Sequence, residues 1–169
     1  IARLIISLLS AIHELWSLNK VHRDIKPENV LVSTDPDRRY ILIDLGLAFN
    51  VEGSNYTADP RAIPGTRYYI PPEFLKQDFR KSIDYRADLY LTGLTAYEFG
   101  SGVNPFFDRH ASYLQILNKV SNLIPTPLHD LRPDLDSGLC LIIDQFLKKI
   151  PALRQANISR LKDQLEAYT

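Results

Sequence analysis

Residues 1–18 carry an apolar stripe with the period of an α-helix. The stripe recurs at steps of three and four residues and comprises Ile1, Leu4, Ile5, Leu8, Leu9, Ile12, Leu15 and Trp16. Side chains at this spacing share one face of a helix, and that face is normally buried. Residues 18–20 end the pattern. The sequence therefore predicts an amphipathic helix that leads directly into a polar loop around Asp24.

The rest of the chain alternates helical patterns with short strands and irregular connections. Residues 30–32 and 40–43 read as strands on either side of a turn-rich stretch, which predicts a small hairpin. Residues 44–73 contain three glycines and four prolines and resist regular structure. Helical patterns follow at residues 85–99, 112–120, 137–149 and 156–168. We expect a mainly α-helical bundle that bears one small β-hairpin.

Composition narrows the class of protein. The chain has 169 residues, enough for one domain, and its 20 basic and 20 acidic residues leave no formal net charge. This balance disfavours nucleic acid or an anionic membrane as a partner, because both require excess positive charge. The sequence contains neither an apolar run long enough for a membrane span nor a signal-peptide pattern. The single cysteine, Cys140, is expected in the core, and we predict a reducing, cytoplasmic location.

Residues 22–44 supply the groups that phosphoryl transfer needs. This chemistry depends on positioning and charge neutralisation. Asp24 is a candidate base beside an attacking hydroxyl, and Lys26 can reach a phosphate. Asn29 and Asp44 offer oxygen ligands of the kind that Mg²⁺ prefers.

The order of these residues resembles the eukaryotic-type protein kinase family. His22-Arg23-Asp24 with Asn29, followed by Asp44-Leu45-Gly46, is similar to that family's catalytic and metal-binding loops. Further residues resemble later landmarks of the family in the same order: Gly65-Thr66, Pro71-Pro72-Glu73, Asp88 with Gly93, and Arg154. The resemblance extends from about residue 1 to residue 167.

The resemblance implies a role for each matching residue. Asp24 would orient the substrate hydroxyl and accept its proton, with Lys26 on the γ-phosphate and Thr66 hydrogen-bonded to both. Asn29 and Asp44 would bind Mg²⁺, and Leu31 would lie beneath the adenine of ATP. The implied structural residues are His22 and Leu45 in a stacked spine, Asp88 behind the catalytic loop, and Arg154 paired with Glu73. The lysine at position 26 resembles serine/threonine kinases, so the implied substrates are Ser and Thr hydroxyls of proteins.

Two substitutions and one absence depart from the family pattern. Leu45 replaces the commoner Phe and Pro71 replaces Ala, but neither change removes a chemical group. The chain contains no Gly-rich phosphate loop and no strand lysine for the nucleotide. We therefore expect residues 1–169 to form only the C-terminal lobe of a kinase domain, as a fragment of a longer protein that is inactive by itself. Without its partner lobe, an apolar strip at Leu31 and Leu45 would be exposed and would favour self-association.

Two other readings compete with an active protein kinase. The chain could be a pseudokinase or scaffold lobe that binds a protein without catalysis, because the strand lysine that would hold the nucleotide is not among its residues. A kinase-fold enzyme that phosphorylates a small molecule is disfavoured by Thr66 and the Pro-Pro-Glu segment. The resemblance also implies that Arg23 could bind a phosphate group on the long loop. Its candidate phosphorylation sites are Ser54, Tyr56 and Thr57. The histidines at 13, 110 and 129 lack a metal-binding spacing and are expected at the surface.

Overall fold

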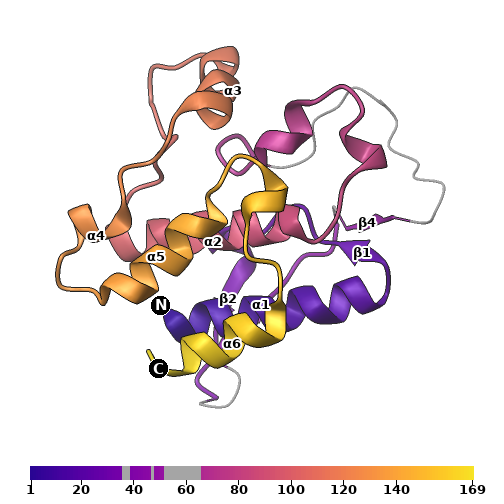
Figure 1. Ribbon diagram of the computed structural model, residues 1–169. Coiled ribbons are helices and arrows are strands. Elements are labelled where there is room, and N and C mark those ends of the chain that lie inside the picture. Colours follow the sequence, from indigo (N-terminus) through magenta and orange to yellow (C-terminus); the bar gives the residue numbers. More distant parts are fainter. Residues whose placement is uncertain (36–38, 47, 52–65) are drawn as a thin grey trace.

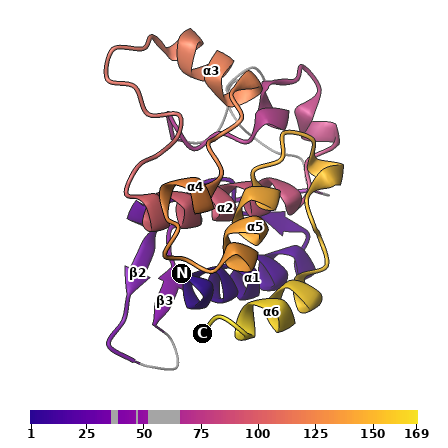
Figure 2. The ribbon, with the colours of Figure 1, turned by 60° about the vertical axis from the view of Figure 1, so that its left-hand side comes forward.

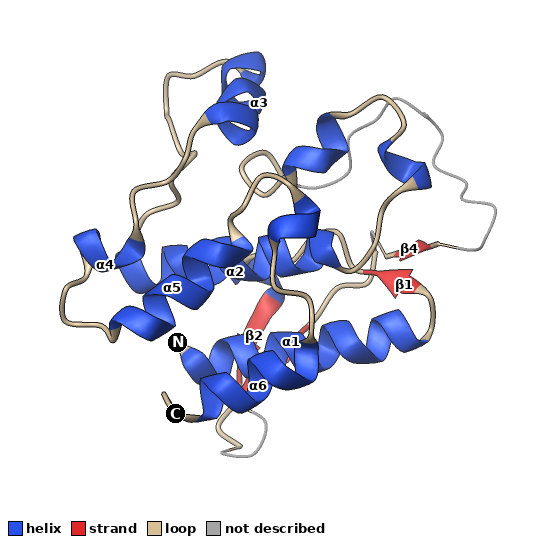
Figure 3. Cartoon of the chain, in the orientation of Figure 1, coloured by secondary structure: helices blue, strands red, loops and turns tan. Residues whose placement is uncertain are grey.

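The structure, a computed structural model, describes residues 1–35, 39–46, 48–51 and 66–169. The candidate phosphorylation sites Ser54, Tyr56 and Thr57 lie outside these ranges. The helices are α1 (Ala2–Ser17), α2 (Arg86–Ser101), α3 (Tyr113–Asn122), α4 (Leu128–Leu131), α5 (Ser137–Phe146) and α6 (Ile158–Glu166) (Figure 1). The strands are β1 (Lys20–Val21), β2 (Val30–Val32), β3 (Tyr40–Leu42) and β4 (Phe49–Asn50) (Figure 3). Four short 3-10 turns complete the described elements: Pro27–Asn29, Pro72–Leu75, Phe79–Lys81 and Pro151–Leu153. The described chain is thus mainly helical, as predicted.

The core lies where α1, α2, α5 and α6 pack together. The predicted stripe of α1 is confirmed, since its central apolar residues are buried: Leu4, Ile5, Leu8, Leu9 and Ile12. Helix α6 runs beside α1, and α5 lies against α2 (Figures 1 and 2). Helix α2 is buried on nearly all sides. Its backbone approaches α5 so closely that a Cβ added at Gly93 would lie 2.5 Å from Phe146 Cβ, so no larger residue fits there.

Two small sheets hold the loops that follow α1. The predicted hairpin is present, with β2 antiparallel to β3 and Leu31 opposite Ile41. A second antiparallel pair, β1 with β4, was not predicted and places Val21 opposite Phe49. Strands of two residues carry no detectable alternation, so only the folded chain reveals this pairing. It ties the start of the Asp24 loop to the segment that follows Asp44.

The helix ends differ from the predicted ones by a few residues, each for a local reason. Helix α5 stops at Phe146 instead of residue 149, and Pro151, which has no N–H to donate to the carbonyl four residues before it, keeps the helix from resuming. Helix α6 begins at Ile158 instead of residue 156, because the Asn157 side chain caps it by accepting a hydrogen bond from the Arg160 N–H at 3.0 Å. Helix α2 continues to Ser101 and ends at Gly102, whose φ of 78° is left-handed. The short α4 lies in a connection that was expected to be irregular.

Helix length also bears on membranes. None of the helices in the described ranges is both long and apolar enough to cross a bilayer. Cys140 is buried in the core, as expected.

A buried ion pair fastens the turn at residues 72–75 to the chain that precedes α6. The two guanidinium nitrogens of Arg154 contact the two carboxylate oxygens of Glu73 at 2.6 and 2.7 Å. Arg154 also donates to the backbone carbonyls of Arg86 and Lys148, both at 2.8 Å. The predicted pairing is therefore confirmed. It joins three segments that lie far apart in the sequence.

We expect Arg154→Ala to lower the free energy of unfolding by about 3–5 kcal/mol, because it leaves the Glu73 carboxylate buried and unpaired. Urea denaturation of a protein that contains this chain measures the change. Arg160→Ala is a matched control, since Arg160 is exposed on α6 and its side chain makes no recorded contact. Equal unfolding midpoints for the two variants would contradict the structural role of the pair.

Candidate active site

The carboxylate of Asp24 lies at the centre of a hydrogen-bonded set of polar side chains. Its Oδ1 accepts a hydrogen bond from the Thr66 hydroxyl at 2.9 Å. Its Oδ2 contacts the Lys26 ammonium at 2.7 Å and accepts from the Asn29 side-chain amide at 3.0 Å. The Lys26 ammonium also lies 2.5 Å from the Thr66 hydroxyl oxygen. Four of the predicted residues therefore meet, although Thr66 is 42 residues from Asp24.

The loop that carries Asp24 is held from behind by Asp88. One oxygen of this fully buried carboxylate accepts from the backbone N–H of His22 at 2.7 Å, and the other accepts from that of Arg23 at 2.9 Å. Arg23 has a left-handed φ of 70°, a conformation that costs energy for a residue other than glycine. The two hydrogen bonds offset this cost. The predicted contact between Asp88 and the loop backbone is present.

Burial perturbs the charged groups of this anchor. Desolvation raises the pKa of Asp88 to about 7, although the two N–H donors and the Arg23 charge oppose the shift. Burial lowers the pKa of Arg23 to about 10, and its guanidinium lies 4.7 Å from the centre of the Phe49 ring on β4. Burial also lowers the pKa of His22, whose Nδ1 accepts from the Asp24 N–H at 3.3 Å. The lowered pKa favours the neutral imidazole, whose Nδ1 is then free to accept this bond from the loop backbone.

A tight turn over residues 66–69 delivers the Thr66 hydroxyl. The Tyr69 N–H donates to the Thr66 carbonyl at 2.8 Å. The Tyr69 hydroxyl donates to the carboxylate of Glu98 on α2, and burial together with this bond raises the pKa of Tyr69 far above its usual range. Tyr69 thus fastens the turn to the central helix.

The side chains predicted to bind metal lie at the neighbouring end of the hairpin. The Ile43 N–H donates to the Asn29 carbonyl at 2.9 Å, which brings the residue before Asp44 next to Asn29. Asp44 has a left-handed φ of 67°, and its Oδ1 accepts from the Gly46 N–H at 2.9 Å. Among the described residues nothing pairs with Asn29 Oδ1 or Asp44 Oδ2. Two hard oxygen ligands on adjacent segments fit the few protein ligands that Mg²⁺ takes.

The residues assigned to the adenine site and to the stacked spine differ in their exposure to solvent. Leu31 is 51% exposed and Leu45 is 59% exposed, so both residues of the expected apolar strip lie at the surface. Ile41, which lies opposite Leu31 across the hairpin, is also exposed. His22 is fully buried, so only one of the two residues assigned to the stacked spine lies in the core of the described chain.

Sequence reasoning missed an acidic hollow beside this site. It has a volume of about 460 Å³ and is lined by Glu28, Tyr68, Tyr69, Glu98, Gly102, Val103, Asn104 and Phe107. Among the described residues, its lining includes two carboxylates and no cationic side chain, which favours positive charge there. The only sequence signal was the position of Glu28 four residues after Asp24, since Glu98 comes from a distant helix.

Other predictions about individual residues also have outcomes. His13, His110 and His129 are exposed, as expected. Across residues 1–35, 39–46, 48–51 and 66–169, no cluster of three or more His, Cys, Asp or Glu side chains could hold a metal ion.

We expect Asp88→Asn to destabilise the protein by about 1–3 kcal/mol, because the amide nitrogen would face a backbone N–H and leave that donor unpaired. The free energy of unfolding measures the change, and exposed Asp163→Asn on α6 is the control. If Asp88→Asn unfolds at the same urea concentration as wild type, the anchor is not stabilising.

Comparison with known proteins agrees with this geometry. Residues 1–164 match the protein kinase domain family. The serine/threonine-protein kinase Sgk1 of Fundulus heteroclitus is 34% identical over 146 residues, which cover 84% of this chain and 30% of that protein. The serine/threonine-protein kinase pkn3 of Myxococcus xanthus is 31% identical over 175 residues, with coverages of 99% and 31%. An Aurora kinase of Debaryomyces hansenii is 36% identical over 147 residues, with coverages of 85% and 32%.

The chain spans about a third of the length of these relatives. The match nevertheless includes the catalytic-loop motif, the hairpin and the buried Glu73–Arg154 pair. The chain belongs to the protein kinase domain family.

Proposed function

We propose that this chain is the C-terminal lobe of a kinase domain that transfers the γ-phosphate of ATP to Ser and Thr hydroxyls of proteins. The observation that carries the proposal is the contact of Asp24 with both Lys26 and Thr66, at 2.7 and 2.9 Å. A base beside a cation is the arrangement that transfer to a hydroxyl requires. The full activity depends on residues outside the chain, which holds no Gly-rich loop or strand lysine.

Each side chain has a distinct role in the proposed reaction. Asp24 orients the substrate hydroxyl toward the phosphorus and takes up its proton as the new P–O bond forms and the bond to the ADP oxygen breaks. Lys26 neutralises charge on the transferred group. Thr66 shares Asp24 Oδ1 with the incoming hydroxyl and restrains the Lys26 ammonium. Asn29 and Asp44 would hold Mg²⁺, which neutralises phosphate charge when bound.

Two further observations support a protein substrate and a nucleotide. The turn at residues 66–69 forms a platform beside the base, and the acidic hollow next to it can receive a side chain of a bound polypeptide. The exposed Leu31 on the hairpin would offer an apolar surface for the adenine.

The test is Asp24→Asn in the whole protein that contains this chain. We expect kcat for transfer of radiolabelled phosphate to myelin basic protein to fall about 10²–10⁴-fold, since the amide cannot accept the proton. Asp163→Asn, an exposed acid on α6, should leave kcat unchanged. Near-normal turnover of Asp24→Asn would overturn the role of Asp24, and label found only on tyrosine would overturn the Ser/Thr assignment. A wild-type protein that transfers no phosphate would support the scaffold alternative.

We also expect residues 1–169 alone to show little transfer activity, because misplacement of a bound nucleotide by even ~1 Å can cost about 100-fold. The same radiolabel assay, run on the isolated chain and on the whole protein at equal concentration, makes the comparison. Equal turnover would show that nucleotide contacts made by the rest of the whole protein are dispensable. Light scattering on the isolated chain tests the expected self-association through Leu31 and Leu45, which a monodisperse monomer at high concentration would contradict.

A further inference from the structure

The turn that carries Thr66 is fastened to a second loop, residues 104–112, which joins α2 to α3. The Arg67 guanidinium donates to the Ala111 carbonyl at 2.6 Å. It also lies 5.5 Å from the centre of the Tyr68 ring. The Tyr68 ring in turn packs against that of Phe107, with centroids 5.3 Å apart. The turn and the loop are therefore linked at two adjacent residues, directly after Thr66.

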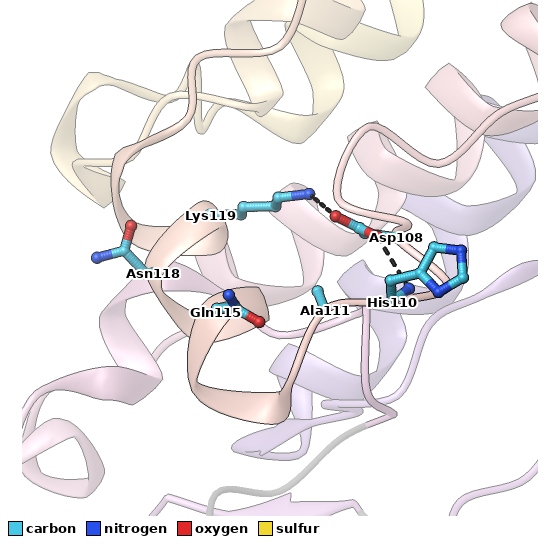
Figure 4. A pocket seen from close by; sticks show the side chains of 6 residues that line it. All are labelled: Asp108, His110, Ala111, Gln115, Asn118 and Lys119. Atoms are coloured by element: carbon cyan, nitrogen blue, oxygen red, sulfur yellow. Dashed lines mark hydrogen bonds and ion pairs between the residues drawn. The ribbon is translucent and has the colours of Figure 1, made fainter.

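The loop is itself anchored to α3 through Asp108. The Asp108 carboxylate contacts the Lys119 ammonium at 2.6 Å and accepts from the His110 N–H at 3.0 Å. Figure 4 shows these contacts beside Ala111, around a hollow of about 380 Å³. Lys119 and the His110 N–H lower the pKa of Asp108, so this carboxylate stays ionised and the anchor persists. A continuous set of contacts thus runs from α3 through the loop to Arg67.

We propose that Arg67 is a positioning residue that holds the Thr66 hydroxyl against Asp24 by fastening the turn to the loop of residues 104–112. The inference rests on the proposed function, because it assigns Thr66 a place beside the catalytic base. Neither the resemblance nor the comparisons assign a role to Arg67.

Three features of the site favour this role over simple surface packing. Arg67 is covalently adjacent to Thr66, so a displacement of one moves the other. The Thr66–Tyr69 bridge, closed by the bond from the Tyr69 N–H to the Thr66 carbonyl, makes residues 66–69 one compact turn, so a contact at Arg67 restrains Thr66 as well. The acceptor of the Arg67 bond is a backbone carbonyl, so the contact fixes the course of the loop as well as the side chain.

The direct test is Arg67→Ala in the whole protein, with Arg109→Ala as its matched control. Arg109 lies in the same loop, is exposed and makes no recorded side-chain contact. We expect Arg67→Ala to lower kcat for myelin basic protein about tenfold while the KM for ATP stays unchanged, because a shift well below 1 Å is sufficient for such a loss. Arg109→Ala should stay within about twofold of wild type. Arg67→Lys keeps one donor for the Ala111 carbonyl and should restore part of the loss.

A double-mutant cycle separates positioning from general damage. If Arg67 acts through Thr66, adding Arg67→Ala to a Thr66→Ala background should cost almost no further kcat, because the hydroxyl it positions is already gone. Independent, multiplicative losses from the two substitutions would overturn the proposal.

Hydrogen exchange gives a readout that does not require activity. In Arg67→Ala the amide of Tyr69, which closes the turn, should exchange faster than in wild type, while Arg109→Ala should leave it unchanged. Lys119→Ala should produce a smaller increase, since it loosens the loop without cutting its bond to the turn. If the Tyr69 amide exchanges faster in Arg67→Ala but the wild-type protein transfers no phosphate, the positioning role of Arg67 is supported and the proposed function is rejected. Unchanged exchange of the Tyr69 amide in Arg67→Ala would reject the positioning role of Arg67.

Discussion

The two hydrogen bonds from the backbone of residues 22 and 23 to Asp88 are the constraint on which the rest of the site depends. They are made by a carboxylate that is fully buried in the central helix α2. Burial of such a group is costly unless its oxygens are satisfied, and here two N–H donors satisfy one oxygen each. The same donors hold Arg23 in its left-handed conformation. The position of Asp24 therefore follows directly from the position of α2 in the core.

Packing against other elements fixes the position of α2, and the position of α2 in turn fixes that of the site. Gly93 lets α2 approach α5 closely, and Arg154 joins the start of α2 to Glu73 in the turn after the long loop. The turn that contains Glu73 lies a few residues beyond Thr66, and the Thr66 hydroxyl donates a hydrogen bond to Asp24. Two segments of the candidate site are thus attached to one helix: the loop that carries Asp24 through Asp88, and the turn that carries Thr66 through Tyr69 and Glu98. A rigid common support keeps catalytic groups at fixed distances without relying on the loops themselves.

The grouping of the candidate site residues could be predicted in part because several of them are close in sequence. Asp24, Lys26 and Asn29 lie within six residues, and the hairpin that brings Asp44 near them has clear strand and turn signals. The contact between Asp88 and the loop backbone could be predicted only from the family resemblance. Asp88 lies 66 residues from His22, and nothing local in the sequence marks it as a partner of that loop. The β1–β4 pair and the hollow containing Glu98 could not be predicted, because two-residue strands and contacts between distant segments leave no periodic signal. The helix ends were misplaced because caps such as Asn157 act on single residues, below the resolution of an apolar pattern.

The hydrogen bonds of Asp24 suggest how the site changes when substrates bind. Both of its carboxylate oxygens are engaged: one by Thr66 and the other by Lys26 and Asn29. A phosphate near Lys26 competes for the ammonium, because a phosphate oxygen carries more charge than a carboxylate oxygen shared with an amide. In the proposed reaction, withdrawal of the ammonium would leave Asn29 as the one side chain on Asp24 Oδ2 among the described residues, so this oxygen could turn toward the substrate hydroxyl. Under the proposed function, Lys26 would thus link phosphate binding to the orientation of the substrate hydroxyl at Asp24.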